Sequence, residues 1–143
     1  MKTSKEVVIL IAEDDDGHAE LIIDGFRELG LANEIIRFED GQEIWNFLMS
    51  KHIEQRESER KNYLILLDIN MPRMDGVEVL RRIKLSPGLQ DMLVMMLTTT
   101  DDPREIERCY QYGCNVYITK PIDFMSFTDT LKRLGLFLQI IKL

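Results

Sequence analysis

The sequence predicts a doubly wound α/β fold, in which helices cover both faces of a five-stranded parallel sheet. Short apolar runs alternate along the chain with segments whose apolar residues recur at helical spacing. Two of the runs have no polar face, which is typical of central parallel strands that are covered on both sides. Acidic residues follow these two runs, and ligand sites of open α/β sheets lie at the carboxyl ends of the strands.

The first part of the chain is expected to supply two strands and two helices. The apolar run Val7–Ala12 predicts the first strand. Apolar residues at helical spacing between residues 19 and 29 predict the helix that follows, and Gly30 is suited to cap its C-terminus. A short second strand is expected at residues 34–38. Helical spacing returns at residues 41–49, which predicts the second helix.

The central part of the chain is expected to contain the most buried strand. Residues 50–62 carry charges of both signs and are interpreted as a solvated helix extension or a loop. The apolar run Tyr63–Leu67 predicts the third strand, and apolar residues at helical spacing over residues 77–83 predict the third helix. Ser86-Pro87-Gly88 stops this helix. The apolar run Met92–Leu97 predicts the fourth strand.

The last part of the chain is expected to supply two helices and one strand. Asp102 is suited to cap a helix that has Pro103 in its first turn and ends near Gly113. The fifth strand is expected at Val116–Thr119. A final helix is expected from Asp123 onward, which completes the alternation of strands and helices.

A group of acidic residues is expected at one edge of the sheet. Glu13, Asp14 and Asp15 directly follow the first strand, and Asp68 directly follows the apolar run of the third. If these strands are neighbours, the acids converge, and their mutual repulsion requires a cation. Mg2+ prefers hard oxygen ligands and keeps several waters. Glu13 and Asp15 taken alone fit solvated loop residues or helix caps, whereas Asp14 and Asp68 together favour a metal site.

Two further strand ends carry a hydroxyl and an ammonium group. The fourth strand is followed by Thr98, and the fifth is followed by Lys120. A carboxylate nucleophile, a metal ion, a compact positive charge and a hydroxyl donor are together what phosphoryl transfer requires. The pattern indicates Asp68 as the nucleophile. Lys120 and Mg2+ would neutralise the phosphoryl oxygens, and Thr98 would donate a hydrogen bond.

With these residues in place, the chain resembles the receiver domain of two-component response regulators. The separation of Thr98 and Lys120, 120 − 98 = 22, also matches the chemotaxis response regulator. The resemblance covers nearly the whole chain, and its motifs are specific as an ordered set rather than singly. The matching residues are Glu13-Asp14, Asp68, Met71-Pro72, Asp75-Gly76, Thr98 and Lys120-Pro121.

The resemblance implies a flavodoxin-like strand order 2-1-3-4-5 and a metal-dependent phosphoacceptor. Asp68 would accept a phosphoryl group from the histidine of a sensor kinase. Mg2+ would be bound by Asp14, Asp68 and the backbone carbonyl of Asn70, with Glu13 acting through a water. The protein would catalyse only its own phosphorylation and dephosphorylation, so it is not expected to be an enzyme that acts on other substrates.

The resemblance also implies a conformational switch. Thr98 and Tyr117 would be the switch pair, and Lys120 would contact the phosphoryl group. The switched protein would signal through protein–protein contacts to a downstream protein that the sequence does not identify.

A narrower resemblance links the chain to stand-alone receivers that partner bacterial phytochromes. It consists of the long charged stretch before the third strand, the segment Leu97-Thr-Thr-Thr100 and the ending Phe137–Leu143. The same features would also fit stand-alone receivers that serve other sensor kinases. A sensor histidine kinase, of phytochrome type or of another type, is therefore the expected partner.

Length and composition predict a single receiver domain over residues 1–143, without an effector domain. An apolar content of 45% and a charged content of 30% are ordinary for a globular domain. The net charge of −7 argues against non-specific binding to nucleic acid. No apolar stretch is long enough to span a membrane, and the polar N-terminus does not resemble a signal peptide, so a cytoplasmic protein is expected.

The last expected helix carries more apolar residues than one core-facing stripe requires. Phe137 and Ile140 are among the residues that fall outside the main stripe. One interpretation is a longer helix that packs against its own domain. The preferred interpretation is a surface for self-association in a homodimer, with Phe137 and Ile140 as contact residues.

Other classes of protein stay open. A flavodoxin-like cofactor binder would carry a Gly/Ser/Thr-rich phosphate loop after the first strand, and the acidic run Glu13-Asp14-Asp15 opposes this. A metal-dependent phosphatase would share the carboxylates but would turn over an external substrate. A scaffold that is never phosphorylated is disfavoured, because the set of strand-end residues is complete.

Overall fold

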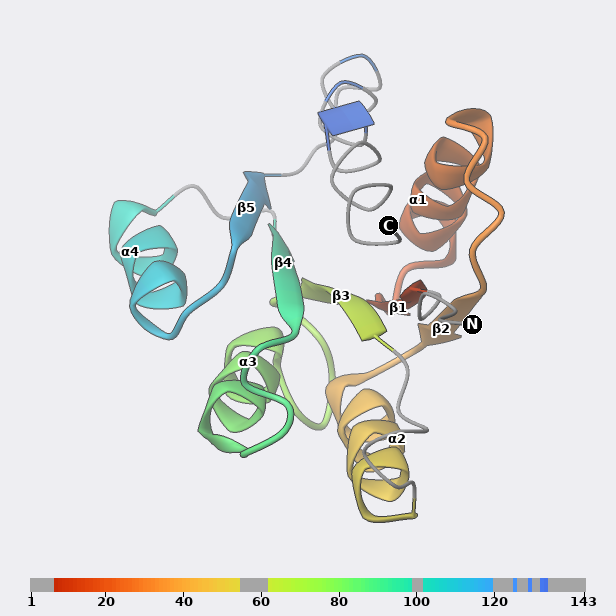
Figure 1. Cartoon of the computed structure of the whole chain (residues 1–143). Coiled ribbons are helices and arrows are strands. Elements are labelled where there is room, and N and C mark those ends of the chain that lie inside the picture. Colours follow the sequence, from red (N-terminus) through yellow and green to blue (C-terminus); the bar gives the residue numbers. More distant parts are fainter. Residues whose placement is uncertain are drawn as a thin grey trace.

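Five parallel strands form one sheet in the order β2-β1-β3-β4-β5 (Figure 1), as expected. The computed structural model describes residues 7–54, 62–98 and 102–119, and beyond these residues 125, 129, 132 and 133. The strands are β1 (Val7–Ala12), β2 (Ile35–Phe38), β3 (Asn62–Asp68), β4 (Leu93–Thr98) and β5 (Val116–Thr119). The first and third strands are therefore neighbours near the centre of the sheet.

Helices connect the strands, which confirms the doubly wound α/β fold. They are α1 (Asp16–Glu28), α2 (Gly41–Glu54), α3 (Gly76–Leu85) and α4 (Pro103–Gln111). Helix α2 is longer than the expected 41–49, because residues 50–54 of the mixed-charge stretch continue it as a helix extension. Residues 55–61 lie outside the described part of the chain.

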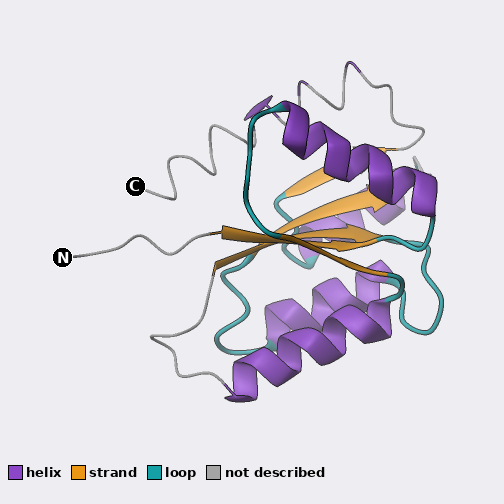
Figure 2. Cartoon of the chain, turned by 90° about the vertical axis from the view of Figure 1, so that its right-hand side faces the viewer, coloured by secondary structure: helices purple, strands orange, loops and turns teal. Residues whose placement is uncertain are grey.

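Both faces of the sheet are covered, by α1 on one face and by α2, α3 and α4 on the other (Figures 1 and 2). Successive residues of a strand point to opposite faces. Val7 and Ile9 of β1 accordingly pack in one core cluster with Phe26 of α1, whereas Leu10 packs in the other cluster with Ile44 of α2. Because both sides of β1 and β3 are apolar and buried, their carboxyl ends are the natural positions for charged side chains.

The register of the strands places the acidic residues side by side at the carboxyl edge of the sheet. In the pairing of β1 with β3, Ala12 lies opposite Leu67, and Glu13 and Asp68 are the next residues of the two strands. Asp68 in turn lies opposite Leu97 of β4, which ends one residue later. The acids that follow two distant segments of the sequence therefore meet at the same edge of the sheet.

Aspartates precede all four of these helices. Each of these side chains accepts a hydrogen bond from a backbone amide in the first turn, which satisfies a group that the helix itself leaves unpaired. They are Asp15 for α1, Asp40 for α2, Asp75 for α3 and Asp102 for α4. Asp15 is thus a helix cap, one of the two interpretations that the sequence left open for it.

Some expected residues lie outside the part of the chain that the structure describes. They are Lys120, the dimer candidates Phe137 and Ile140, and most of the helix expected from Asp123. Among the described residues, no helix is both long and apolar enough to cross a membrane.

Candidate functional site

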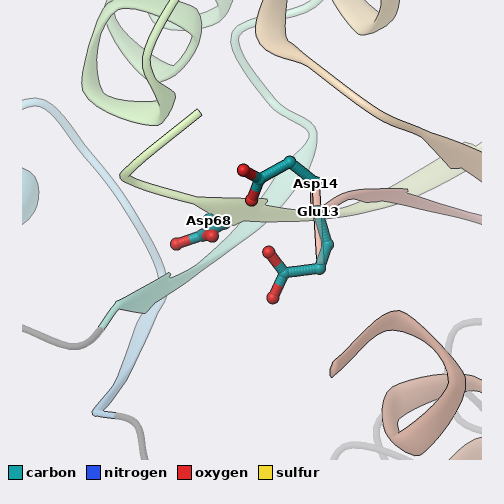
Figure 3. Close-up of side chains that lie close together, drawn as sticks. All are labelled: Glu13, Asp14 and Asp68. Atoms are coloured by element: carbon teal, nitrogen blue, oxygen red, sulfur yellow. The ribbon is translucent and has the colours of Figure 1, made fainter. Parts of the chain in front are cut away.

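Three carboxylates lie together at the carboxyl edge of the sheet. Glu13, Asp14 and Asp68 each offer one carboxylate oxygen, and these oxygens all lie within 4.8 Å of one another. Figure 3 shows the side chains at the ends of β1 and β3, with their carboxylates close together. The pairing of these two strands thus brings together the acids that the sequence singled out.

Burial makes this group of like charges costly without a counterion. Glu13 is fully buried and Asp68 is 6% exposed, whereas Asp14 is exposed. Two unit charges at such a separation repel each other by roughly 3–4 kcal/mol at an effective dielectric constant of about 20. A divalent cation would offset this repulsion, and carboxylate oxygens are the hard ligands that Mg2+ prefers. The donor set therefore fits the metal ion that the sequence predicts.

The end of β3 is fixed by the loop that leads to α3. The Asn70 amide donates a hydrogen bond to Oδ1 of Asp68 at 3.3 Å. The Gly76 amide donates to the Ile69 carbonyl at 2.9 Å, which closes the loop onto β3. A Cβ at Gly76 would overlap the Asp68 carbonyl, so this close approach requires glycine. This packing holds the backbone of Asp68 in place, while the Asn70 carbonyl as a metal ligand stays a prediction.

Arg37 of β2 holds the loop between β1 and α1. Its Nε and Nη2 donate to the Glu13 carbonyl at 3.1 and 2.8 Å, and its Nη1 donates to Oδ1 of Asp16 at 2.6 Å. The Glu13 amide donates to the Phe38 carbonyl at 3.0 Å. Both backbone groups of Glu13 are therefore bonded to β2, and this fixes the direction in which the acidic loop leaves the sheet.

His18 lies beside the buried glutamate. Its Nδ1 is 3.4 Å from Oε1 of Glu13 and 3.8 Å from Oδ1 of Asp15. The His18 amide also donates to the Asp15 side chain at 2.9 Å, so the cap of α1 fixes the backbone of His18. The sequence contains no pattern that points to this contact, and the structure places His18 next to the site.

The remaining expected site residues belong to β4, β5 and the segment after β5. Thr98 is the last residue of β4 and pairs with Thr119, while its side chain lies outside the described residues. Tyr117 is half-buried on β5 and packs against the core on the face of α2, α3 and α4. Lys120 lies outside the described residues. The switch pair and the phosphoryl contact therefore stay predictions.

Sequence reasoning missed the arginines that hold the two loops of the site. Arg37 binds the loop after β1, and Arg73 in the loop after β3 binds both oxygens of Asp40. The partners are 24 and 33 positions apart in the sequence, so no local motif joins them. The one signal available was a charged residue within the otherwise apolar second strand, which is Arg37.

The fold and the site together define a class of protein. A doubly wound α/β sheet presents a nearly buried carboxylate at the end of its central strand, with two acids from the neighbouring strand beside it. The donor atoms of this arrangement suit a divalent cation. The chain matches the family model described as response regulator receiver domain over residues 9–132. It therefore belongs to the response regulator receiver family, as its motifs indicated, and it is a receiver domain of two-component signalling.

Similar proteins include response regulators of phytochromes. The chain is 36% identical to response regulator Rcp1 of Synechocystis sp., over 79% of this chain and 76% of Rcp1. The crystal structure of Mn2+-bound Rcp1 is 30% identical, with a TM-score of 0.71 over 91% of this chain and 92% of that chain. The crystal structure of the phosphorylated cyanobacterial phytochrome response regulator RcpA is 29% identical, with a TM-score of 0.79 over 94% of each chain.

A bacterial receiver domain is also similar along nearly its whole length. The crystal structure of a response regulator receiver domain from Rhodospirillum rubrum is 44% identical to this chain. The TM-score is 0.81, over 93% of this chain and 94% of that chain. These comparisons confirm both the family and the narrower resemblance to receivers of the phytochrome-partner type.

Proposed function

We propose that the protein is a response regulator whose receiver domain accepts a phosphoryl group on Asp68 from the histidine of a sensor kinase. The observation that carries this proposal is the group formed by Glu13, Asp14 and Asp68, whose carboxylate oxygens lie within 4.8 Å of one another. Asp68 is the member that ends the central strand, where chemistry gathers in open α/β sheets. Membership of the receiver family supports the same role.

The proposed reaction is a nucleophilic displacement at phosphorus. A carboxylate oxygen of Asp68 attacks the phosphorus of a phosphohistidine, and the bond between phosphorus and the histidine nitrogen breaks. Asp14, Asp68 and the Asn70 carbonyl would hold Mg2+, with Glu13 acting through a water. The bound ion would supply positive charge next to the phosphoryl oxygens. Lys120 would supply a second positive charge there.

Labelling by a small phosphodonor tests the proposal. Wild-type protein incubated with acetyl phosphate and Mg2+ should gain one phosphoryl group per chain, visible by intact-mass spectrometry. The label should be stable in acid and labile in base, as an acyl phosphate is, and EDTA should prevent it. Asp68→Asn is nearly isosteric and should not be labelled. Labelling that persists in Asp68→Asn or in EDTA would show that another residue or another chemistry is involved.

The same experiment separates the other classes of protein. A phosphatase would release phosphate from an external phosphoester through many turnovers, whereas a phosphoacceptor gains a stoichiometric label that decays after the donor is removed. A cofactor binder would take no label from acetyl phosphate, and the acidic residues after β1 oppose a phosphate-binding loop there. A scaffold would likewise take no label. Turnover of an external phosphoester would contradict the proposal.

We propose that Thr98 and Tyr117 carry the signal to the surface of the domain. Phosphorylation is expected to draw Thr98 towards the phosphoryl oxygens and to let Tyr117 move inward. The surface formed by α4, β5 and the last expected helix would then shift from one conformation towards another. Tyr117 of β5 packs against the core cluster that includes Cys109 of α4, which supports its coupling to the surface formed by these elements. Crystal structures with and without beryllofluoride should differ at both side chains, and identical rotamers would contradict the switch.

The expected kinase is a sensor histidine kinase of the phytochrome type. Similarity to the phytochrome response regulator RcpA and to bacteriophytochrome response regulators supports this choice. A phosphotransfer profile tests it: phytochrome-type and unrelated kinases are phosphorylated separately, and the rates of transfer to this protein are compared. The cognate kinase should transfer the phosphoryl group fastest. Faster transfer from an unrelated kinase would remove the phytochrome assignment but leave the phosphoacceptor proposal standing.

A further inference from the structure

The β3–α3 loop contains a strained turn centred on Arg73. Arg73 has a φ of 68°, and within the described part of the chain no other non-glycine residue has a positive φ. The Met74 amide donates a hydrogen bond to the Pro72 carbonyl at 2.8 Å across this residue. A three-residue turn with a positive φ at its centre is rare and strained. Glycine would adopt the same conformation without a steric penalty.

The side chain of Arg73 anchors this turn to the start of α2. Its Nε and Nη2 donate to Oδ2 and Oδ1 of Asp40 at 3.0 and 3.2 Å. Asp40 is itself fixed, because it also accepts a hydrogen bond from the Glu43 amide at 2.8 Å. Burial acts to raise the pKa of Asp40, but the Glu43 amide and the Arg73 guanidinium outweigh it and hold that pKa below its ordinary value. The carboxylate is therefore charged and oriented for a two-pronged contact.

A backbone contact seats the same loop on α2. A Cβ at Gly41 would overlap the Met74 carbonyl, so the loop lies directly on the first residue of the helix. At the end of the loop, Gly76 approaches Asp68 just as closely. The segment from Asp68 to Gly76 is therefore fixed at its ends and at the strained turn, and Asn70 lies between these points.

We infer that Asp40 and Arg73 form a positioning pair for the metal site, an inference that rests on the proposed function. The pair fixes the loop that carries Asn70, whose backbone carbonyl is the proposed protein ligand from this loop. The contact with Arg73 lowers the pKa of Asp40 and so adds to folding stability, but this contribution is small. An arginine side chain that is 57% exposed gains little from an ion pair, and glycine at this position would relieve the strain. The arginine holds the loop in one place.

Calorimetric titration of Mg2+ into the unphosphorylated full chain tests the inference. The variants are Arg73→Gln, Asp40→Asn and the double variant; asparagine can still cap α2. Each single variant should bind Mg2+ about three- to tenfold more weakly, which is less than the roughly 10- to 100-fold effect of residues that contact a ligand directly. The double variant should bind Mg2+ with the same affinity as the single variant that binds it more weakly, because the two side chains act as one unit.

Two further variants separate positioning from other effects. Arg81→Gln is a matched control, because it breaks a similar two-pronged contact, from Arg81 to Glu78 at 3.0 and 2.6 Å, within α3. It should change the Mg2+ affinity less than about twofold. Arg73→Gly removes both the strain and the anchor. It should fold at least as stably as Arg73→Gln and yet bind Mg2+ equally weakly.

A measurement without metal adds a readout that activity cannot provide. Amide hydrogen exchange in EDTA reports how often the loop opens. Exchange across the segment from Asn70 to Gly76 should accelerate about tenfold in Arg73→Gln and Arg73→Gly, whereas Arg81→Gln should leave it unchanged.

Wild-type Mg2+ affinity in Arg73→Gly would overturn the inference, because the turn would then need no anchor. Equal losses in Arg81→Gln and Arg73→Gln would also overturn it, because the effect would not be specific to this loop. Neither result would contradict the proposed function, because the labelling of Asp68 is measured separately. A wild-type protein that binds no Mg2+ would instead overturn the proposed function and, with it, this inference.

Discussion

Asp68 owes its chemistry to its place at the end of the most buried strand. The residues before it are apolar and buried, and the residue after it begins a closed loop, so the carboxylate is nearly buried yet lies at an edge of the sheet. Beside it lie two carboxylates on β1 and its following loop. At this scale we expect the repulsion among the three acids to lower the stability of the metal-free protein and to favour binding of a cation.

Asp14→Asn tests this expectation. The change removes one of the close negative charges, so the metal-free variant should be more stable than wild type by about 0.5–2 kcal/mol in urea unfolding with EDTA. The same change removes a charged ligand, and the affinity for Mg2+ should fall at least about tenfold. Asp24→Asn removes an exposed negative charge elsewhere and is the control. Lower metal-free stability in Asp14→Asn would mean that repulsion does not dominate this group.

At the scale of elements, two arginines fix the loops at the carboxyl edge of the sheet. Each arginine joins one of these loops to a neighbouring segment. Arg37 reaches from β2 to the loop after β1 and bonds to both Glu13 and Asp16. Arg73 reaches from the loop after β3 to the start of α2. The acids of the site thus lie at the end of β3 and in the loop after β1, where contacts with neighbouring segments fix the backbone.

Replacing Arg37 should affect both stability and metal binding. Arg37→Ala leaves the Glu13 carbonyl without its guanidinium donors, and the unfolding free energy should fall by about 1–3 kcal/mol. Looser placement of the β1–α1 loop should also weaken Mg2+ binding, by about threefold or more. Urea unfolding and calorimetric titration measure the two effects. Unchanged Mg2+ affinity in a destabilised variant would show that the loop keeps its position without this side chain.

The outer face of α3 carries a pH-dependent contribution to stability. Hydrogen bonds from Arg81 and Arg82 lower the pKa of Glu78 from 4.5 to about 2. Because the folded-state pKa is depressed, the contribution is present above about pH 4.5 and is lost as the pH falls through about 2. The three side chains are 33–41% exposed, so solvent screening reduces the contribution to about 0.5–1 kcal/mol.

Urea unfolding across pH tests this contribution. Glu78→Gln should be less stable than wild type by that amount, about 0.5–1 kcal/mol, at pH 7. The difference between the two proteins should shrink steadily between pH 5 and pH 2, where the wild-type carboxylate also loses its charge. Glu20→Gln, on the exposed side of α1, is the control for a change of net charge. A difference that stays constant with pH would mean that the arginines do not act through the charge of Glu78.

At the scale of the whole molecule, the expected output is association with another protein. The net charge of −7 disfavours an output through binding to nucleic acid. The apolar surplus of the last expected helix favours a symmetric homodimer, since a two-fold contact is the commonest way in which a small protein buries one surface. The dimer candidates, Phe137 and Ile140, lie outside the described residues, so this surface is a proposal from the sequence.

Sedimentation analysis tests the dimer. Burying a phenylalanine or leucine side chain contributes roughly 1.5–3 kcal/mol before the costs of association, so several such residues are enough to support a dimer. Wild-type protein should sediment as a dimer, more strongly with beryllofluoride, whereas Phe137→Asp should remain monomeric. Monomeric wild type at high concentration in both states would contradict the dimer. A dimer that beryllofluoride does not affect would contradict only its control by phosphorylation.

The sequence by itself determined the fold class and most of the candidate acids. Apolar runs and helical spacing are local patterns, and they located the strands to within one or two residues because burial on both faces leaves no polar position inside β1 or β3. Placement at strand ends then singled out Asp14 and Asp68. The strand order followed from the resemblance to receivers, because local pattern does not specify which strands pair.

The tertiary structure decided how the acids meet and what holds them. The pairing of Ala12 with Leu67 sets Glu13 level with Asp68, and it depends on contacts between segments far apart in the chain. The contacts of Arg37 and Arg73 are likewise long-range and leave no periodic trace in the sequence. Local pattern reports which side chains are buried, whereas the position of a charged side chain depends on which distant backbone or carboxylate the fold brings to it.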